Sequence, residues 1–146
     1  MDVDTIPSHE ALIKLQTIVT RSRDALSGYS IIVDEAEPEI RAVAQSLRGL
    51  HENHVAELSG MLRGFGVTPD LNGSLMPTVN DTMISLQALV GDVDADALER
   101  MYESEVEVLK SFDEALEEMM GFPQCHAICA MRHDLAQLLK HSKGSE

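Results

Sequence analysis

The stretch IRAVAQSLRGLHENHVAELSGMLRGF, residues 40–65, repeats apolar residues at intervals of three and four, as one side of an α-helix does. His54 lies in the middle of the apolar stripe, and His51 lies on its flank, where we expect it to touch water. An imidazole buried among leucines needs a polar partner from another part of the fold. The stripe consists of Ile40, Val43, Leu47, Leu50, Leu58, Met61 and Phe65.

Helix signals continue along the rest of the chain. Ser8 can cap a first helix, and Pro38 ends that helix and suits the first turn of the next. The glycines of RGFG, residues 63–66, favour a left-handed stop. We therefore expect long helices over about 8–36, 38–65, 94–120 and 123–140, with a short amphipathic helix over 78–90 inside the connection that spans 66–93.

The helix lengths predict the architecture. The first three helices hold roughly 26 to 29 residues each, or ~40 Å, and helices of that length pack lengthwise beside one another. Short links favour antiparallel pairs, whereas the long connection can cross the length of the bundle. The sequence therefore predicts an all-α fold, namely a ferritin-like antiparallel four-helix bundle with a long crossover that carries a short extra helix. We expect one domain over 1–146, with its core at 8–140 and a flexible tail at 141–146.

Composition narrows the partners. The chain of 146 residues has 11 basic and 25 acidic residues and a formal net charge of -14. Such a surface repels phosphate backbones and anionic lipids, so we expect no nucleic-acid and no membrane partner. The start MDVDTIPSHEAL lacks a cationic segment followed by an apolar one, and no apolar run nears the ~18 residues of a membrane span. We expect a cytoplasmic protein with reduced cysteines.

Polar residues on the core faces of the other helices are few. Glu105 falls on the centre line of the third helix, and a lone carboxylate there is costly unless it is paired or bound to a ligand. The first helix offers Ser22 and Tyr29 near its stripe and no acid. The acids of the third helix that point outward, towards solvent, are Glu99, Glu103, Glu107, Asp113, Glu114, Glu117 and Glu118.

Four segments resemble an uncharacterised bacterial ferritin-like family, known as a domain of unknown function. These segments are SGYSIIVDEAEPEIR (27–41), HENHVAEL (51–58), NGSLMPTV (72–79) and ESEVEVLKSFDEAL (103–116). The resemblance spans most of residues 8–140 and implies a ferritin-like bundle. Ferritin-like di-iron proteins use one Glu from each of two helices and a Glu-x-x-His from each of the other two.

The resemblance assigns Glu105 as the acid of the third helix and His54 as the histidine of the second. His51 replaces the acid three residues before His54, and the first and fourth helices lack their ligands, so the di-iron set is incomplete. His51, His54 and Glu105 remain as a candidate mononuclear site for Fe(II) or Zn(II). The structural alternative, which we favour, is a buried hydrogen-bonded pair of His54 and Glu105 that fixes helix register.

On the fourth helix, CHAICAMRH (125–133) places Cys125 and Cys129 at the edge of the core stripe, where we expect small core thiols, and His126 and His133 in solvent. Ile13 and Ile31 lie off the stripe of the first helix. They either seat the crossover helix or form a homodimer face, and we prefer the dimer.

No phosphate loop, nucleophile elbow or zinc-ribbon spacing is present in the sequence. Two classes of function survive. One is a non-catalytic bundle with a degenerate metal centre, that is, one with an incomplete ligand set, and with a stress, interaction or small-ligand role. We favour this class over an enzyme. An unknown protein partner is compatible with it. The other is a metal-binding protein with a mononuclear or partial di-iron site that does redox or metal-handling chemistry.

Overall fold

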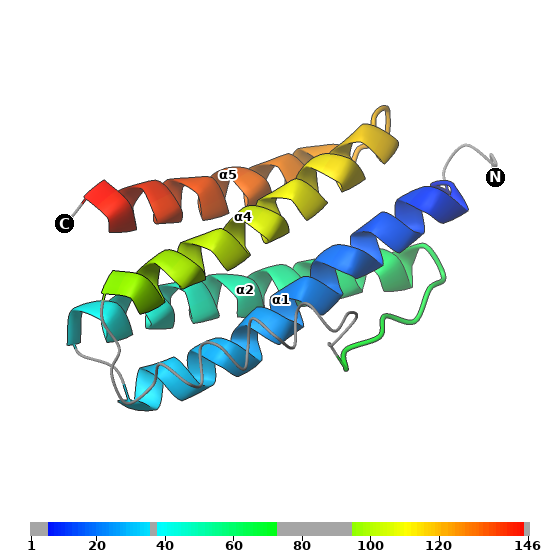
Figure 1. Cartoon of the computed structure of the whole chain (residues 1–146). Helices are drawn as coiled ribbons and strands as arrows, with labels where there is room; N and C mark the ends of the chain where they lie inside the picture. Colours follow the sequence, from blue (N-terminus) through cyan, green and yellow to red (C-terminus); the bar gives the residue numbers. More distant parts are fainter. Residues whose placement is uncertain (1–5, 36–37, 73–94, 145–146) are drawn as a thin grey trace.

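The computed structural model describes residues 6–35, 38–72 and 95–144 (Figure 1). These residues form α1 (His9–Glu35), α2 (Pro38–Gly64), α4 (Ala95–Glu118) and α5 (Cys125–Gly144), with no strand among them. The predicted all-α class is confirmed. The short helix predicted over 78–90 lies outside the described residues. At the other end of the chain, α5 continues through Gly144, beyond its expected end near Lys140.

The four helices form a bundle of two antiparallel hairpins. In Figure 1, α1 and α2 make one hairpin, while α4 and α5 make the other. α1 packs against α2 and α4, and α5 packs against α4 and α2, so α2 and α4 are diagonal partners. A side chain that reaches from α2 to α4 therefore crosses the middle of the core.

Helix ends follow the local sequence. Ser8 caps α1 as predicted, because its Oγ accepts a hydrogen bond from the Ala11 amide at 3.1 Å. After α2, Gly66 adopts a φ of 86°. The Gly66 amide donates to the Arg63 carbonyl at 3.0 Å and the Val67 amide to the Leu62 carbonyl at 2.9 Å, which is a Schellman stop. The left-handed stop predicted for RGFG is thereby confirmed.

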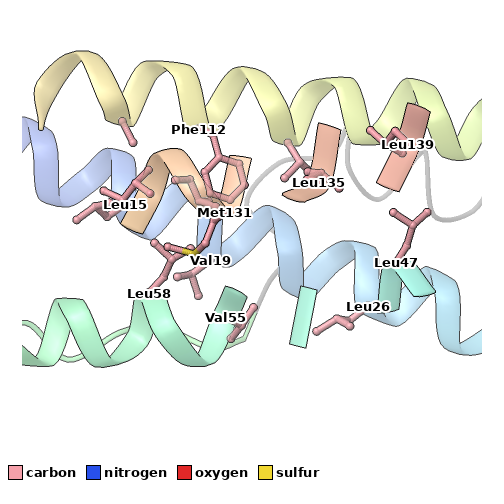
Figure 2. Close-up of a cluster of buried hydrophobic side chains, with 14 of the residues drawn as sticks. Leu15, Val19, Leu26, Leu47, Val55, Leu58, Phe112, Met131, Leu135 and Leu139 are labelled. Carbon is pink, nitrogen blue, oxygen red and sulfur yellow. The ribbon is translucent and has the colours of Figure 1, made fainter. Parts of the chain in front are cut away.

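The core is one cluster, mostly of leucine, valine and methionine side chains, that extends along the bundle and receives residues from all four helices (Figure 2). Phe112 of α4 and Met131 of α5 lie in its centre (Figure 2). Among the side chains with no exposed surface are Leu15, Ile18, Leu47, Leu58, Leu62, Met101, Phe112, Met119, Ile128 and Leu135.

The buried face of α2 differs from the predicted stripe. Ala44, Val55 and Leu62 are buried, while Leu50 and Met61 are only partly so. At 100° per residue, this rotates the centre of the buried arc by about 60°, onto His51. The expectation that His51 lies on a flank and touches water is therefore wrong: its side chain is 0% exposed.

Surface positions follow the predicted pattern with one exception. All seven acids expected to point outward from α4 are exposed, as are His126 and His133. Cys125 is partly buried against the core, but Cys129 is exposed, so the prediction of two core thiols is wrong for Cys129. The two thiols are one helical turn apart on α5, but only Cys125 packs against the core.

Two expectations about partners stay predictions, namely the homodimer and the absence of a membrane partner. Ile13 is 47% exposed, as a dimer face requires, but the side chain of Ile31 lies outside the described part of the chain. Within the described residues, no helix is both long and apolar enough to cross a membrane.

The stop of α2 gives a stability prediction. Gly66→Ala forces a side chain into the left-handed region, so we expect it to lower the free energy of unfolding by about 1 kcal/mol. Gly60→Ala is the matched control, because Gly60 lies inside α2 with open space where a Cβ would stand, and we expect a gain of about 0.5 to 1 kcal/mol. Urea unfolding measures both, and equal effects of the two substitutions would contradict the assignment.

Candidate functional site

Three helices bring one polar side chain each into the centre of the bundle. Nε2 of His51 on α2 lies 2.9 Å from Oε1 and 2.8 Å from Oε2 of Glu105 on α4. The hydroxyl of Tyr29 on α1 donates a hydrogen bond to the same Oε2. Tyr29 is 1% exposed, and His51 and Glu105 are 0% exposed. We call these three residues the polar cluster.

Helical periodicity places each member of the polar cluster. Tyr29 follows Leu26 by three residues on the core face of α1, and His51 follows the buried Leu47 by four residues on α2. On α4, Glu105 lies four residues after Met101 and three before Val108, both of which are buried. Side chains at these spacings share a helix face, so the packing of their apolar neighbours carries the three polar groups inward.

The cluster accounts for most of its own hydrogen-bonding groups. Burial, and after it the negative charge of Glu105, raises the pKa of Tyr29 well above its usual value, so the phenol keeps its proton and donates. His51 then donates from Nε2 in the tautomer that suits the carboxylate. Nδ1 of His51 has no hydrogen-bond partner among the described residues.

Aromatic rings extend the cluster across the core. The Tyr29 and His51 rings stack, with centroids 6.1 Å apart and planes 14° apart. The His51 and His54 rings meet edge to face with centroids 6.5 Å apart, and the His54 and Phe112 rings do so with centroids 5.7 Å apart. Such offset and edge contacts suit the charge distribution of the rings.

His54 is buried without a bond to Glu105. It is 2% exposed, and its Nδ1 has no hydrogen-bond partner among the described residues. The predicted hydrogen bond between His54 and Glu105 is therefore wrong for the histidine, since the imidazole that bonds Glu105 belongs to His51. Burial, and after it the neighbouring His51, lowers the pKa of His54 to about 4, although Asp134 and Glu105 oppose the shift. His54 is neutral at pH 7.

The first helix has no acid on its core face, but it contributes a hydrogen-bond donor, Tyr29, to the polar cluster. Tyr29 lies near the stripe of α1 as expected, but the stripe alone does not predict that its hydroxyl donates to Glu105. Its phase relative to Leu26 is the available signal, because a phenol at a core position needs an acceptor. Ser22, the other polar residue near that stripe, is buried, and its hydroxyl has no hydrogen-bond partner within the described residues.

The candidate metal ligands are close to one another but are not arranged as one coordination set. Within the described residues, no three His, Cys, Asp or Glu side chains are grouped so that they hold a metal ion. His51 and Glu105 share a hydrogen bond, whereas the His54 ring meets the His51 ring in an edge-to-face contact. A metal at His51, His54 and Glu105 therefore stays a prediction.

Taken together, these residues define a helical bundle with a buried polar cluster at the level where α1, α2 and α4 meet. Comparison with known families gives the particular group: a family model described as Domain of unknown function (DUF2383) matches residues 10–118, and the chain belongs to this family. The match contains all three members of the polar cluster. No curated protein and no solved structure matches the chain.

The buried, neutral His54 predicts a pH dependence of stability. The unfolded chain protonates this histidine near its ordinary pKa of 6.5, but the folded chain does so only near 4. The free energy of unfolding should therefore fall as the pH is lowered from 6.5 to about 4, by up to about 3 kcal/mol, with no contribution from His54 above that window. His54→Gln should remove this component in urea unfolding curves recorded with chelator.

His133→Gln is the control for this pH series, because His133 is exposed on α5 and should leave the curve unchanged. Parallel pH curves for wild type and His54→Gln would show that His54 is not buried in its neutral form.

Proposed function

We propose that this protein is a non-catalytic, ferritin-like bundle in which Tyr29, His51 and Glu105 form a structural polar centre. This centre is the degenerate counterpart of a metal centre, with an incomplete set of ligands. One observation carries the proposal: both oxygens of Glu105 face His51, and one of them also accepts from Tyr29. A carboxylate whose partners are supplied by the protein itself has its desolvation offset without a ligand.

Access supports a structural role over a catalytic one. His51 and Glu105 have no exposed surface and Tyr29 has almost none. An acid and a base act on a substrate only when its reacting atoms come within hydrogen-bond reach, and close-packed side chains leave no such space here. The polar cluster instead holds three helices at one level.

Register is what the cluster specifies. Apolar core positions tolerate a shift of one helix along another better than a buried carboxylate does, because leucine contacts are not directional. A slip of α4 by one turn, about 5.4 Å, would remove Glu105 from both donors. We infer that the polar centre selects one packing of α1, α2 and α4 over its neighbours.

Replacing the cluster tests this role. Glu105→Leu leaves the Tyr29 hydroxyl and the His51 imidazole buried without an acceptor, so we expect a loss of about 3 to 5 kcal/mol. The triple variant Tyr29→Phe, His51→Leu and Glu105→Leu removes every partner at once, and it should regain most of that loss. Thermal unfolding with chelator present measures both.

Glu103→Leu serves as the matched control, because this residue is exposed on α4 and should change the free energy of unfolding by less than about 0.5 kcal/mol. A triple variant as unstable as Glu105→Leu alone would overturn the structural role. So would a wild-type protein that unfolds at a lower temperature once its metal is removed.

A metal-binding function is the second candidate, and His54 is the observation in its favour. A neutral imidazole with an unbonded Nδ1 is a competent ligand for Fe(II) or Zn(II), and His51 and Glu105 lie beside it. The ion would displace the hydrogen bond between His51 and Glu105 and use both residues as ligands, and there it would supply Lewis-acid or redox chemistry.

Cobalt titration separates the two candidates. If the second is correct, one equivalent of Co(II) should bind with the visible absorption of nitrogen and oxygen ligation, and Zn(II) should displace it. Metal at 100 times the dissociation constant should raise the free energy of unfolding by about 2.7 kcal/mol. His54→Gln should abolish uptake while His133→Gln retains it, and wild type that takes up no metal would end this candidate.

We also propose a cytoplasmic homodimer. The free thiols of Cys125 and Cys129 support a reducing compartment, and the exposed Ile13 supports a second apolar contact surface on α1.

A further inference from the structure

After α2 ends, residues 67–72 continue without regular secondary structure and double back along the bundle (Figure 1). We call this segment the strap. The positive φ of Gly66 reverses the chain before it, and Pro69 restricts Thr68 to extended backbone. Pro69 is buried although its neighbours on both sides are exposed, and Val67 is partly buried against the core. The strap is therefore seated on the bundle through two small apolar side chains.

The side-chain amide of Gln16 on α1 pairs with the backbone of Asp70 in the strap. Nε2 of Gln16 donates to the Asp70 carbonyl at 2.8 Å, and Oε1 accepts from the Asp70 amide at 2.9 Å. A residue on a neighbouring antiparallel strand makes the same two bonds with its partner. Nε2 also donates to Oγ1 of Thr20, one turn further along α1, at 3.0 Å. One side chain thus satisfies both backbone groups of the residue that it holds.

The chemistry of this contact requires a glutamine. The carbonyl of Asp70 and the hydroxyl oxygen of Thr20 both accept from Nε2, while the Asp70 amide needs an acceptor, so only one orientation of the Gln16 amide fits. A carboxylate at this position would set one of its oxygens against the carbonyl oxygen of Asp70. The two oxygens would repel each other, and the paired geometry would be lost.

α1 alone holds the strap through side chains. Within the residues that the structure describes, the side-chain hydrogen bonds that reach the strap from outside it come from Gln16 and from Arg23, whose Nε donates to the Leu71 carbonyl at 3.0 Å. These bonds lie at the surface, where water competes for the same groups, so their net contribution is small. The four helices are joined by a buried apolar core. A segment held in this way can open while the bundle stays folded.

We propose that the strap opens and closes over α1 as a unit of its own, and that Gln16 is its latch. When the strap is closed, it fixes the start of the connection from α2 to α4 on α1. When it is open, the start of that connection is released. The proposal rests on hydrogen bonds at the surface of α1 and is independent of the polar cluster.

Amide hydrogen exchange, followed residue by residue by NMR, tests the proposal. The Asp70 amide should be protected in the wild type, yet exchange well before the amide of Leu58 in the middle of α2. Gln16→Leu removes both bonds to Asp70 and should speed exchange of the Asp70 amide at least about tenfold. Gln16→Glu should do so too, because of the repulsion between oxygens. The Leu58 amide reports on the fold, and its rate should change by less than about threefold in either variant.

Gln137→Leu and Gln137→Glu are the matched controls, because Gln137 is exposed on α5 and makes the same two chemical changes there. Both should leave exchange at Asp70 as in the wild type. Three results would overturn the proposal: a wild-type Asp70 amide without protection, one that exchanges only as fast as that of Leu58, or unchanged exchange of this amide in Gln16→Leu. The first shows that the strap is not closed, the second that it opens only with the bundle, and the third that Gln16 is not its latch.

Discussion

The buried carboxylate of Glu105 is the constraint on which this bundle depends. Removing a carboxylate from water costs several kcal/mol unless donors replace the lost hydration. Those donors come from two other helices, the Nε2 of His51 and the hydroxyl of Tyr29. The aliphatic core around them supplies most of the stabilisation, but it is tolerant of sliding. The Glu105 contacts tie α1, α2 and α4 to one another at a single level.

α5 differs from the other three helices because it takes no part in the hydrogen bonds of Glu105. It contributes Ile128, Met131 and Leu135 to the core but no member of the polar cluster, and the family match ends at residue 118, before α5 begins. Ala56 of α2 and Ala127 and Ala130 of α5 line an open groove beside His54. A fixed three-helix polar centre and an open α2–α5 face thus coexist in one bundle. They can do so because α5 is held by apolar contacts and by the surface ion pair of Arg132 with Asp113 on α4.

Periodicity and helix-end signals are sufficient for the helices, the Ser8 cap, the stop at Gly66 and the burial of Glu105, since each depends on neighbours in sequence. They fail for His51 because α2 carries apolar residues on two overlapping arcs, and the predicted stripe follows the wrong one. It omits Ala44, Val55 and Leu62, all of which are buried and lie on the same side of α2 as His51. The choice between His51 and His54 as the partner of Glu105 depends on the rotation of α2 about its axis, which only the packing of the neighbouring helices decides.

His54 lies beside the polar cluster and limits what the cluster can bind. A neutral imidazole has one nitrogen that carries a proton and one that carries a free lone pair. A metal shared with His51 would require that lone pair, and it would also require His51 to give up its hydrogen bond to Glu105. The edge-to-face contacts of the His54 ring with His51 and with Phe112 restrict its rotation. A bundle in which Glu105 keeps its two protein donors is therefore a bundle whose inner cluster stays metal-free.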